Sequence, residues 1–308
     1  MTAFVLALIG IPLFGLVTGL IAMVVGCIAL VGHSSARRGM ALAVAAIVIG
    51  LFEVVGWAVG LYYVLGTPHS MIALNQLTID PESLEELPAR ISRAMRANVI
   101  VETGMGLGQG LGSGVILKFN DGIAHIVTNR HVVDPSYSEK TDTVPKDLSS
   151  LRNISVTTVG EESIPATVEW LAPHGVDLAI ISAPLLSNKA EEAYWDQKIT
   201  PHIGDSVFAV GNPHGLGWTH SAGDISQIRR QKHGDYDIRM IQTTAAINPG
   251  NSGGGLYDSE GRLIGINSMT GDKRVAEGLG FSIALRTLMD LVPDQLHLPH
   301  QNPEPKTK

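Results

Sequence analysis

The chain has 308 residues, of which 45% are hydrophobic, and a formal net charge of -7 at pH 7. This charge gives no basic field that would attract nucleic acid, so a nucleic-acid-binding function is excluded. The single cysteine, Cys27, excludes a disulfide within the chain. The hydrophobic residues are concentrated in the first 65 positions, which are almost free of charge, and the remainder has the composition of an ordinary soluble domain.

Two long apolar stretches occupy the N-terminal part. Residues 4–31 contain no charged side chain, and residues 40–65 contain only Glu53. Each stretch is longer than the roughly 20 residues that a helix needs to cross a bilayer. A cleaved signal peptide is disfavoured, because residues 1–3 carry no basic side chain and a second apolar stretch follows at once. Residues 1–65 are therefore predicted to form a retained two-helix transmembrane anchor.

The loop between these stretches sets the expected orientation. It contains Arg37 and Arg38, whereas no Lys or Arg follows the second stretch until Arg90. The positive-inside rule places this loop in the cytoplasm and both ends of the chain outside. We therefore expect a multi-pass membrane protein with an extracytoplasmic soluble part.

Two features inside the apolar stretches each admit more than one interpretation. Gly15 and Gly19, like Gly56 and Gly60, have the spacing that lets helices pack closely, but glycine is also frequent in membrane helices generally. Glu53 is costly at mid-bilayer. It is either a tolerated neutral acid or a residue that faces a partner helix.

The soluble part is predicted to begin with a linker and a short helix over residues 66–97. Asp80 and Pro81 are typical of a helix start, and Pro88 interrupts or restarts this helix. Residues 98–293 follow as the main domain, with a short helix at 284–291 near its end. Residues 294–308 are rich in proline and polar residues and are predicted to be disordered.

The main domain contains many short β-rich stretches separated by Gly, Asn, Asp and Pro. This pattern is typical of a barrel or a sandwich and not of a parallel α/β sheet. The expected strands are 98–101, 115–119, 124–128, 154–159, 166–171, 178–182, 206–210, 225–229, 238–243 and 262–268.

A candidate nucleophile lies in the segment Gly-Asn-Ser-Gly-Gly at residues 250–254. Glycines around Ser252 allow a tight turn that exposes the hydroxyl group. They also allow the N–H groups of Gly250 and Ser252 to point into one cavity, as an oxyanion hole requires. Taken alone, such a cluster is more often an ordinary turn.

A candidate base and a candidate carboxylate occur earlier in the chain. His131 lies at the end of a β-rich run, Thr-Asn-Arg-His-Val-Val, just before a loop. Asp177 opens the apolar run Val-Asp-Leu-Ala-Ile-Ile, where a partly buried carboxylate needs a partner. Alone, each has a plainer interpretation, as a structural histidine and a turn aspartate. Together with Ser252 they supply the base, the orienting acid and the nucleophile of amide hydrolysis by a serine.

The order His, Asp, Ser along the chain is that of the chymotrypsin-like arrangement. Over roughly residues 98–293 the sequence resembles the bacterial HtrA (Deg) branch of the trypsin-like serine proteases. The matching stretches are 112–116, 128–133, 177–179, 204–207, 211–216, 246–254 and 278–283. The resemblance implies an all-β fold of two antiparallel six-stranded β-barrels with the active site between them. His131 and Asp177 would come from the first barrel and Ser252 from the second.

The resemblance also implies a role for each residue. Ser252 attacks the scissile carbonyl, His131 transfers its proton to the leaving amine, and Asp177 orients the imidazole. Ala246, six residues before the nucleophile, would floor the primary specificity pocket together with Ile247. Because neither is acidic, a small or medium aliphatic residue before the cut is expected. The backbone of residues 267–269 (Asn267, Ser268 and Met269) is expected to pair with an extended substrate.

The implied partners and location complete this hypothesis. The expected partners are polypeptide substrates and the bilayer. The resemblance to the family implies that the substrates are unfolded or misfolded envelope proteins. A homo-oligomer, often a trimer in relatives, is also possible. The location is the bacterial cytoplasmic (inner) membrane with a periplasmic protease domain. No cofactor is expected, and a metal enzyme is disfavoured because no His or Cys cluster has ligand spacing.

Two departures from the family pattern and two alternatives are relevant. The chain ends soon after the last expected barrel, so no PDZ domain is expected, and residues 134–153 form a polar loop that is long for this branch. One alternative is a binding or chaperone-like protein that keeps the protease fold with a switched-off active site. The other is the Gly-x-Ser-x-Gly elbow of α/β-hydrolases, which is disfavoured because no helix is expected directly after Ser252.

Overall fold

The computed structural model divides the chain into two compact units, Met1–Leu77 and Thr78–Lys308, each of which is described by itself. The described residues are 15–32, 37–65, 82–83, 86–105, 108–138, 143–151, 153–160, 162–173, 175–185, 190–196, 198–233, 236–268, 278–296, 298–299 and 301–302. Residues 4–14 of the first apolar stretch and the predicted helix start at Asp80 and Pro81 lie outside them.

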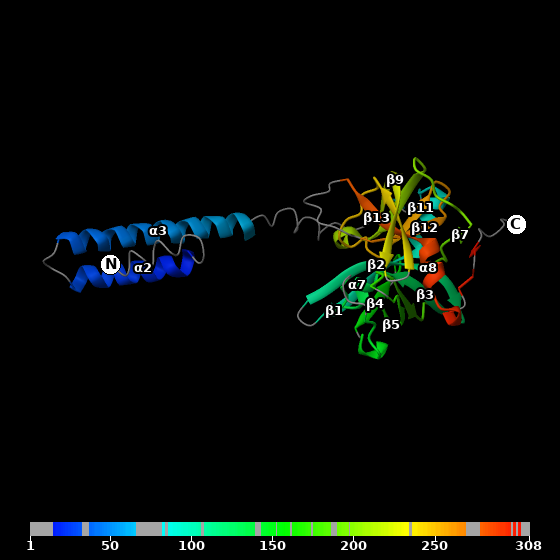
Figure 1. The fold of residues 1–308 in the computed structure, drawn as a ribbon, viewed down its shortest axis with the longest axis horizontal. Coiled ribbons are helices and arrows are strands. Elements are labelled where there is room, and N and C mark those ends of the chain that lie inside the picture. The colour runs from blue at the N-terminus through cyan, green and yellow to red at the C-terminus, as the bar shows by residue number, and fades with distance from the viewer. Residues whose placement is uncertain are drawn as a thin grey trace. The chain divides into compact units, whose positions relative to one another are not determined.

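The N-terminal unit contains two helices, α2 (Gly15–Gly32) and α3 (Arg37–Leu65), which lie side by side (Figure 1). A Cβ atom at Gly19 would lie only 2.7 Å from the carbonyl oxygen of Gly50, so the two backbones touch at this point. Such close approach is what small residues allow in membrane helices. The predicted packing role therefore holds for Gly19. A Cβ atom at Gly56 would have no neighbour within 4 Å among the described residues, so the structure gives no support for a packing role there.

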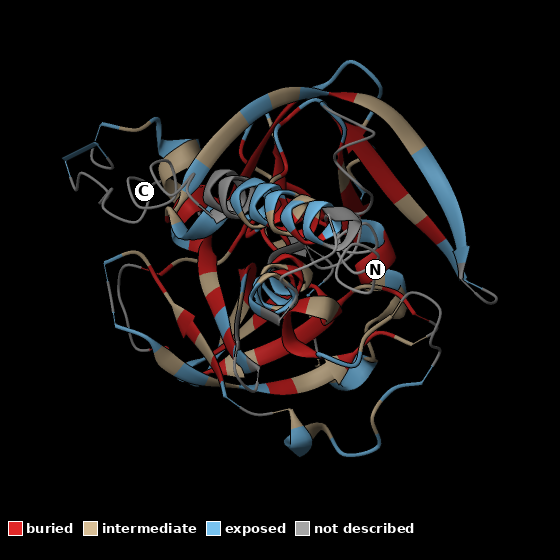
Figure 2. Ribbon diagram, turned by 90° about the vertical axis from the view of Figure 1, so that its left-hand side faces the viewer, coloured by how far each residue is buried: buried red, intermediate tan, exposed pale blue. Residues whose placement is uncertain are grey.

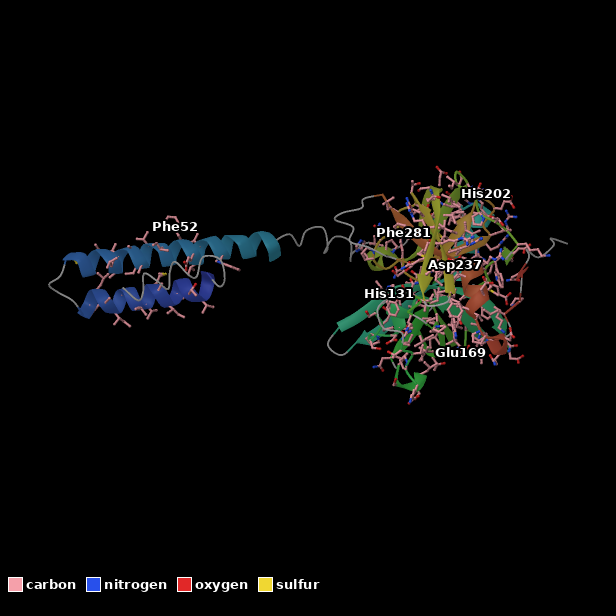
Figure 3. All side chains as sticks on the ribbon, viewed as in Figure 1. Phe52, His131, Glu169, His202, Asp237 and Phe281 are labelled. Carbon is pink, nitrogen blue, oxygen red and sulfur yellow. The ribbon has the colours of Figure 1, made fainter. Side chains whose placement is uncertain are left out.

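Glu53 of α3 faces α2. It is only 6% exposed, and its Oε2 accepts a hydrogen bond of 3.4 Å from Thr18 Oγ1, while Oε1 has no partner among the described residues. The adjacent Phe52 is 74% exposed and points away from α2 (Figure 3). Of the two interpretations of Glu53, the structure therefore favours contact with a partner helix, and the partner is α2.

One segment within the described residues, Met40–Trp57 in α3, is long and apolar enough to cross a membrane. The apolar part of α2, Val17–Val31, is shorter than such a segment. The first of the two predicted spans included residues 4–14, which are not described, so the two-span arrangement stays a prediction.

The second unit contains two closed barrels whose neighbouring strands are all antiparallel (Figure 1). The first has the order β1-β2-β3-β6-β5-β4, with strands β1 (Asn98–Met105), β2 (Gly108–Asn120), β3 (Ile123–Thr128), β4 (Ile154–Thr157), β5 (Ile164–Leu171) and β6 (Ala179–Ala183). The second has the order β10-β13-β12-β11-β8-β9, with strands β8 (Ser206–Gly211), β9 (Thr219–His233), β10 (Tyr236–Thr243), β11 (Gly255–Asp258), β12 (Leu263–Asn267) and β13 (Gly280–Ala284). The predicted fold of two six-stranded barrels is thus confirmed.

Short elements complete this unit. They are α6 (Ala89–Ala97), α7 (Arg130–Val133), α8 (Leu285–Leu291), the 3-10 turns η1 (Leu148–Ser150), η2 (Pro213–Gly215) and η3 (Asp294–Leu296), and the paired strands β7 (Trp195–Asp196) and β14 (Gln301–Asn302). Buried and more exposed residues alternate along β1 and β4, whereas β6, β8, β11 and β12 are buried along most of their length (Figure 2). Each barrel has its own apolar core, and a third cluster joins both barrels to α6 and α8.

Strands β11 and β13 were not expected from the sequence. Both begin at a glycine, a residue that normally weakens a strand. At Gly280 the glycine is required, because a Cβ atom there would lie 2.6 Å from the Ile247 side chain. Close packing thus explains why these strands lack the β-branched pattern by which the others were found.

The structure describes residues 294–296, 298–299 and 301–302 of the tail that was predicted to be disordered, and some of them contact the domain. Lys118 Nζ donates to the Leu296 carbonyl oxygen at 2.6 Å. Strand β14 pairs with β7, and Asn302 Nδ2 donates to Glu192 Oε2 at 3.0 Å and to the Ala193 carbonyl oxygen at 2.8 Å. Of the polar residues in this tail, Asn302 thus makes side-chain hydrogen bonds to the domain. Residues 303–308 lie outside the described part.

Asn98 joins the start of the first barrel to the second. It is 1% exposed, and its Nδ2 donates to the Ala94 carbonyl oxygen and to Tyr257 Oη, both at 2.6 Å. Its Oδ1 accepts from the Gly255 amide at 3.0 Å, and its carbonyl oxygen accepts from Trp218 Nε1 at 2.7 Å. Burial raises the pKa of the Tyr257 hydroxyl, which therefore stays protonated.

Replacing Asn98 with alanine should lower the free energy of unfolding by about 3 kcal/mol, because the Gly255 amide loses its acceptor inside the protein. Asn120→Ala, at an exposed asparagine of β2, is the control and should cost less than about 0.5 kcal/mol. Urea unfolding of the detergent-solubilised chain measures both. Equal effects of the two substitutions would contradict this role of Asn98.

Candidate active site

His131 and Asp177 form a directly bonded pair. His131 lies in the short helix α7, and Asp177 lies just before β6. The His131 Nδ1 atom is 2.7 Å from Asp177 Oδ2, and the His131 amide donates to Asp177 Oδ1 at 2.9 Å. Because a carboxylate accepts only, Nδ1 carries the proton and Nε2 of the neutral ring has a free lone pair. The His131 side chain is 36% exposed, so this lone pair belongs to an accessible imidazole.

Two further side chains hold Asp177. Ser268 Oγ, from the second barrel, donates to Asp177 Oδ2 at 3.0 Å. Asn129 Nδ2 donates to the Asp177 carbonyl oxygen at 2.7 Å. The Asp177 carboxylate therefore accepts three hydrogen bonds and has one defined orientation. The hydroxyl of Ser268 was missed by sequence reasoning, which considered only its backbone.

The nucleophile segment 250–254 follows β10 and runs into β11, against the strands of the first barrel. The Ser113 amide of β2 donates to the Ser252 carbonyl oxygen at 2.7 Å. At Gly253, which has φ 87°, a Cβ atom would collide with the Ser113 carbonyl oxygen and with Thr128 Oγ1. Only glycine permits this contact and this backbone conformation. Ser252 is thereby held beside the segment that ends in His131.

The backbone of this segment leaves two amides without a protein acceptor among the described residues. The Asn251, Gly253 and Gly254 amides donate to the carbonyl oxygens of Asn248, Asn267 and Asn251, at 2.9, 2.8 and 2.9 Å. The amides of Gly250 and Ser252 make no such bond. Amides without a protein acceptor are the kind of donor that an oxyanion site requires, and the role predicted for Gly250 and Ser252 stays a prediction.

Comparison with known proteins fits this geometry. A family profile for the trypsin-like peptidase domain matches residues 112–266, which is half of the chain.

The chain belongs to the trypsin-like peptidase family.

Individual relatives are of the HtrA type. The serine endoprotease DegS of Escherichia coli is 33% identical over 249 residues, covering 74% of this chain and 64% of that protein. A probable periplasmic serine endoprotease, DegP-like, of Buchnera aphidicola is 37% identical over 185 residues, 59% of this chain and 35% of that one. The solved structure of an HtrA-type protease, an AlgW variant with a tripeptide, has a TM-score of 0.52 and 31% identity, covering 65% of this chain and 60% of that chain. The chain thus spans about a third to two thirds of these proteins.

The predicted substrate-binding residues have different surroundings in this trypsin-like domain. Ala246 is exposed, and its amide donates to Ser221 Oγ at 2.8 Å. Ile247 is only 3% exposed and packs in the core of the second barrel, so its side chain does not line an open pocket. Met269 lies outside the described residues. Figure 3 shows Phe281 of the second barrel and His131 of the first.

Asn267 does not fit its predicted role of pairing with a substrate. Its amide donates to the Gly254 carbonyl oxygen at 2.7 Å, and its carbonyl oxygen accepts from the Gly253 amide at 2.8 Å. Both backbone groups are thus used to hold the nucleophile segment. The Ser268 amide donates to the Phe281 carbonyl oxygen at 2.9 Å, so of these two residues only the Ser268 carbonyl group is left for a substrate.

A buried ion pair lies beside His131 at the start of the polar loop predicted at residues 134–153. Arg130 and Asp134 have side chains that are 1% and 0% exposed, and Arg130 Nε donates to Asp134 Oδ2 at 3.0 Å. The guanidinium group also donates to the carbonyl oxygens of Ala172, at 3.3 Å, and Thr143, at 2.7 Å. Arg130 therefore connects the helical turn of His131 to the segment that leads to Asp177.

Tyr137 adds a second connection. Its hydroxyl donates to the Gly175 carbonyl oxygen at 2.8 Å, and its ring centroid lies 5.5 Å from the Arg130 guanidinium carbon and 6.4 Å from the His131 ring centroid. The first part of the long loop is therefore packed against the catalytic histidine candidate and is not a detached surface insertion.

Among the described residues, no group of three or more His, Cys, Asp or Glu side chains is arranged to hold a metal ion.

Replacing Asp134 with asparagine should lower the free energy of unfolding by about 3 kcal/mol, because it leaves the Arg130 charge buried without its counter-ion. The matched control is Asp237→Asn, which breaks an Arg–Asp pair whose side chains are 62% and 46% exposed and should cost less than about 1 kcal/mol. Thermal and urea unfolding distinguish these outcomes. A similar small cost for both pairs would show that the buried pair does not hold this region together.

Proposed function

We propose that the chain is a membrane-anchored serine endopeptidase that cleaves unfolded or misfolded envelope polypeptides through an acyl-enzyme. The observation that carries the proposal is the His131–Asp177 pair, with Nδ1 2.7 Å from Oδ2, next to a serine whose own turn has two unused amides. Membership of the trypsin-like peptidase family supports the same reaction.

The reaction follows from these positions. His131 Nε2 accepts the Ser252 Oγ proton while Oγ forms a bond to the scissile carbonyl carbon. The carbonyl oxygen becomes an oxyanion and accepts hydrogen bonds from the Gly250 and Ser252 amides. The intermediate collapses as the C–N bond breaks and His131 gives its proton to the leaving amine. Water then attacks the acyl-enzyme with His131 again as the base, which releases the acid and restores Ser252. Asp177 keeps Nδ1 protonated and stabilises the imidazolium.

The N-terminal unit provides the proposed anchor. The apolar segment Met40–Trp57 supports attachment to a bilayer, and Arg37 and Arg38 support a cytoplasmic loop with a periplasmic protease domain. A probable periplasmic relative agrees with this location. Two spans in the bacterial inner membrane, and assembly into a trimer, are further parts of the proposal. Accessibility labelling of single introduced cysteines and the mass of the detergent-solubilised protein test them.

The proposed nucleophile predicts a covalent reaction. A fluorophosphonate probe should label the detergent-solubilised protein, and Ser252→Ala should abolish labelling, because the probe reacts with an activated serine. Peptide hydrolysis by Ser252→Ala should fall by about 10⁶-fold, the loss known for removal of a triad serine. His131→Ala should also prevent labelling, since it removes the base.

The controls separate activity from folding. Serine substitutions elsewhere, such as Ser149→Ala at an exposed position, should leave labelling unchanged. Labelling of Ser252→Ala at the parent rate would refute the assignment of the nucleophile. A folded parent that is never labelled would support the alternative of a binding or chaperone-like protein with a switched-off site.

The proposed endopeptidase should prefer a small or medium aliphatic residue before the cut, because Ala246 brings no negative charge to the pocket floor. A peptide-library cleavage profile measures this preference. Ala246→Asp, which adds a carboxylate at the same position, should shift the profile toward Lys and Arg. A parent profile dominated by basic residues, or one unaffected by Ala246→Asp, would refute the assignment of Ala246.

A further inference from the structure

Ser113 of β2 is a buried junction between the first barrel and the nucleophile segment. It is 1% exposed, and its Oγ donates to the Gly250 carbonyl oxygen at 2.7 Å and accepts from the Asn212 amide at 2.9 Å. Its amide donates to the Ser252 carbonyl oxygen at 2.7 Å, and its own carbonyl oxygen accepts from Thr128 Oγ1 at 2.7 Å. Every polar atom of Ser113 therefore has a partner, and two of the partners are carbonyl groups of the nucleophile turn.

The carbonyl contacts fix the directions of the free amides. In a trans peptide the C=O and N–H groups point in opposite directions. The Pro249 carbonyl oxygen accepts from the His214 amide at 2.8 Å, so the Gly250 N–H group points away from His214. The Asn251 carbonyl oxygen accepts from the Gly254 amide at 2.9 Å, so the Ser252 N–H group points away from the Gly254 amide.

The Ser113 hydroxyl holds the peptide group that lies between the Pro249–Gly250 and Asn251–Ser252 peptide groups. This peptide group joins Gly250 to Asn251. Its N–H group, that of Asn251, donates to the Asn248 carbonyl oxygen at 2.9 Å within the turn, and its carbonyl group accepts from Ser113 Oγ at 2.7 Å, the bond that ties this peptide to the other barrel. Gly250 has φ 97°, a conformation from which a glycine moves easily because it lacks a side chain. A rotation at this peptide changes the angle between the two free amides. The relative direction of the two amides therefore depends in part on a hydroxyl group from the other barrel.

We propose that the Ser113 side chain is a positioning residue for the oxyanion site. Its hydroxyl holds the Gly250–Asn251 peptide so that the Gly250 and Ser252 amides point at the same substrate oxygen. The inference rests on the proposed endopeptidase function. It adds a residue that touches neither the substrate nor His131 and that acts through the backbone of the nucleophile turn.

The turn that carries His214 supports the same arrangement from the second barrel. His214 has φ 54°, a left-handed conformation that is uncommon without glycine. Its side chain is exposed, whereas its amide makes the bond to Pro249. The Asn212 side chain closes this turn, since its Oδ1 accepts from the Gly217 amide at 2.5 Å. Ser113 Oγ, bonded to the Asn212 amide, therefore links both supports of the nucleophile turn.

The test is Ser113→Ala in the full-length, detergent-solubilised protein, beside Thr287→Val. Thr287 on α8 is a matched control, because it is also buried and its Oγ1 accepts a backbone amide, that of Arg239, at 3.0 Å. Both variants lose one buried hydroxyl, so their stabilities should fall by similar amounts. Only Ser113→Ala should lose activity, by about 100-fold in kcat for a peptide substrate with KM changed less than threefold, as a donor misplaced by about 1 Å predicts.

The pH profile separates this role from damage to the triad. Ser113→Ala should lower kcat/KM at every pH without moving the midpoint of its rise, because His131 and Asp177 keep their contacts. A shifted midpoint, or equal losses of activity in Ser113→Ala and Thr287→Val, would overturn the inference in favour of a general structural role.

A second measurement is independent of catalysis. Hydrogen exchange followed by mass spectrometry should show faster exchange at residues 250–254 in Ser113→Ala and unchanged exchange there in Thr287→Val. Unchanged exchange in Ser113→Ala would overturn the inference even if the parent were inactive. Failure of the fluorophosphonate probe to label the parent would refute the proposed function separately.

Discussion

The hydrogen bonds that cross between the two barrels are the constraint on which the site depends. The Ser113 amide and hydroxyl hold Ser252 and Gly250 from the first barrel, and Ser268 Oγ of the second barrel holds Asp177 of the first. Ser113 and Ser268 are each less than 2% exposed. Water therefore cannot replace them as hydrogen-bond partners, and breaking one of these bonds would leave a buried polar group unpaired. Reciprocal bonds of this kind fix the relative position of His131 and the nucleophile without any covalent link.

The buried Arg130–Asp134 pair contributes a different kind of constraint. A buried ion pair adds little to stability against an apolar replacement, but breaking it is costly because one charge stays behind. Arg130 uses two of its remaining donors on the Ala172 and Thr143 carbonyl groups. The pair therefore holds the chain on both sides of His131 in one arrangement. The first residues of the long loop between His131 and Asp177 are thus packed beside the candidate active site.

Much of this arrangement could be predicted from the sequence. The short β-rich stretches of residues 98–293, separated by Gly, Asn, Asp and Pro, indicated a barrel fold, and the local settings of His131 and Asp177 indicated two residues that the fold joins by hydrogen bonds. The sequence did not indicate β11 and β13, because close contacts there require glycine where a strand pattern has β-branched residues. Nor did it indicate the contacts of Leu296 and Asn302, whose partners, Lys118 and Glu192, are about 110 to 180 positions away in the sequence.

The missed site residues have a common physical cause. Ser268 and Ser113 act through single hydrogen bonds to residues about 90 and 140 positions away, and no local pattern marks a serine as such a donor. Asn267 was expected to pair with a substrate because it lies on the correct strand, but its two backbone groups are used by the nucleophile turn. A strand position defines which groups are near the site, and only the complete hydrogen-bond pattern defines which of them are free.

Glycine has the same dependence on context in both units. Gly19 lies where a second backbone leaves no room for a Cβ atom, and Gly253 lies against the Ser113 carbonyl group of another barrel, whereas Gly56 has no neighbour within 4 Å among the described residues. What distinguishes them is an approaching backbone, which in the hairpin is α3 and in the domain is β2. Close backbone approach thus joins two helices that carry few charges and seats the turn of Ser252 against the first barrel.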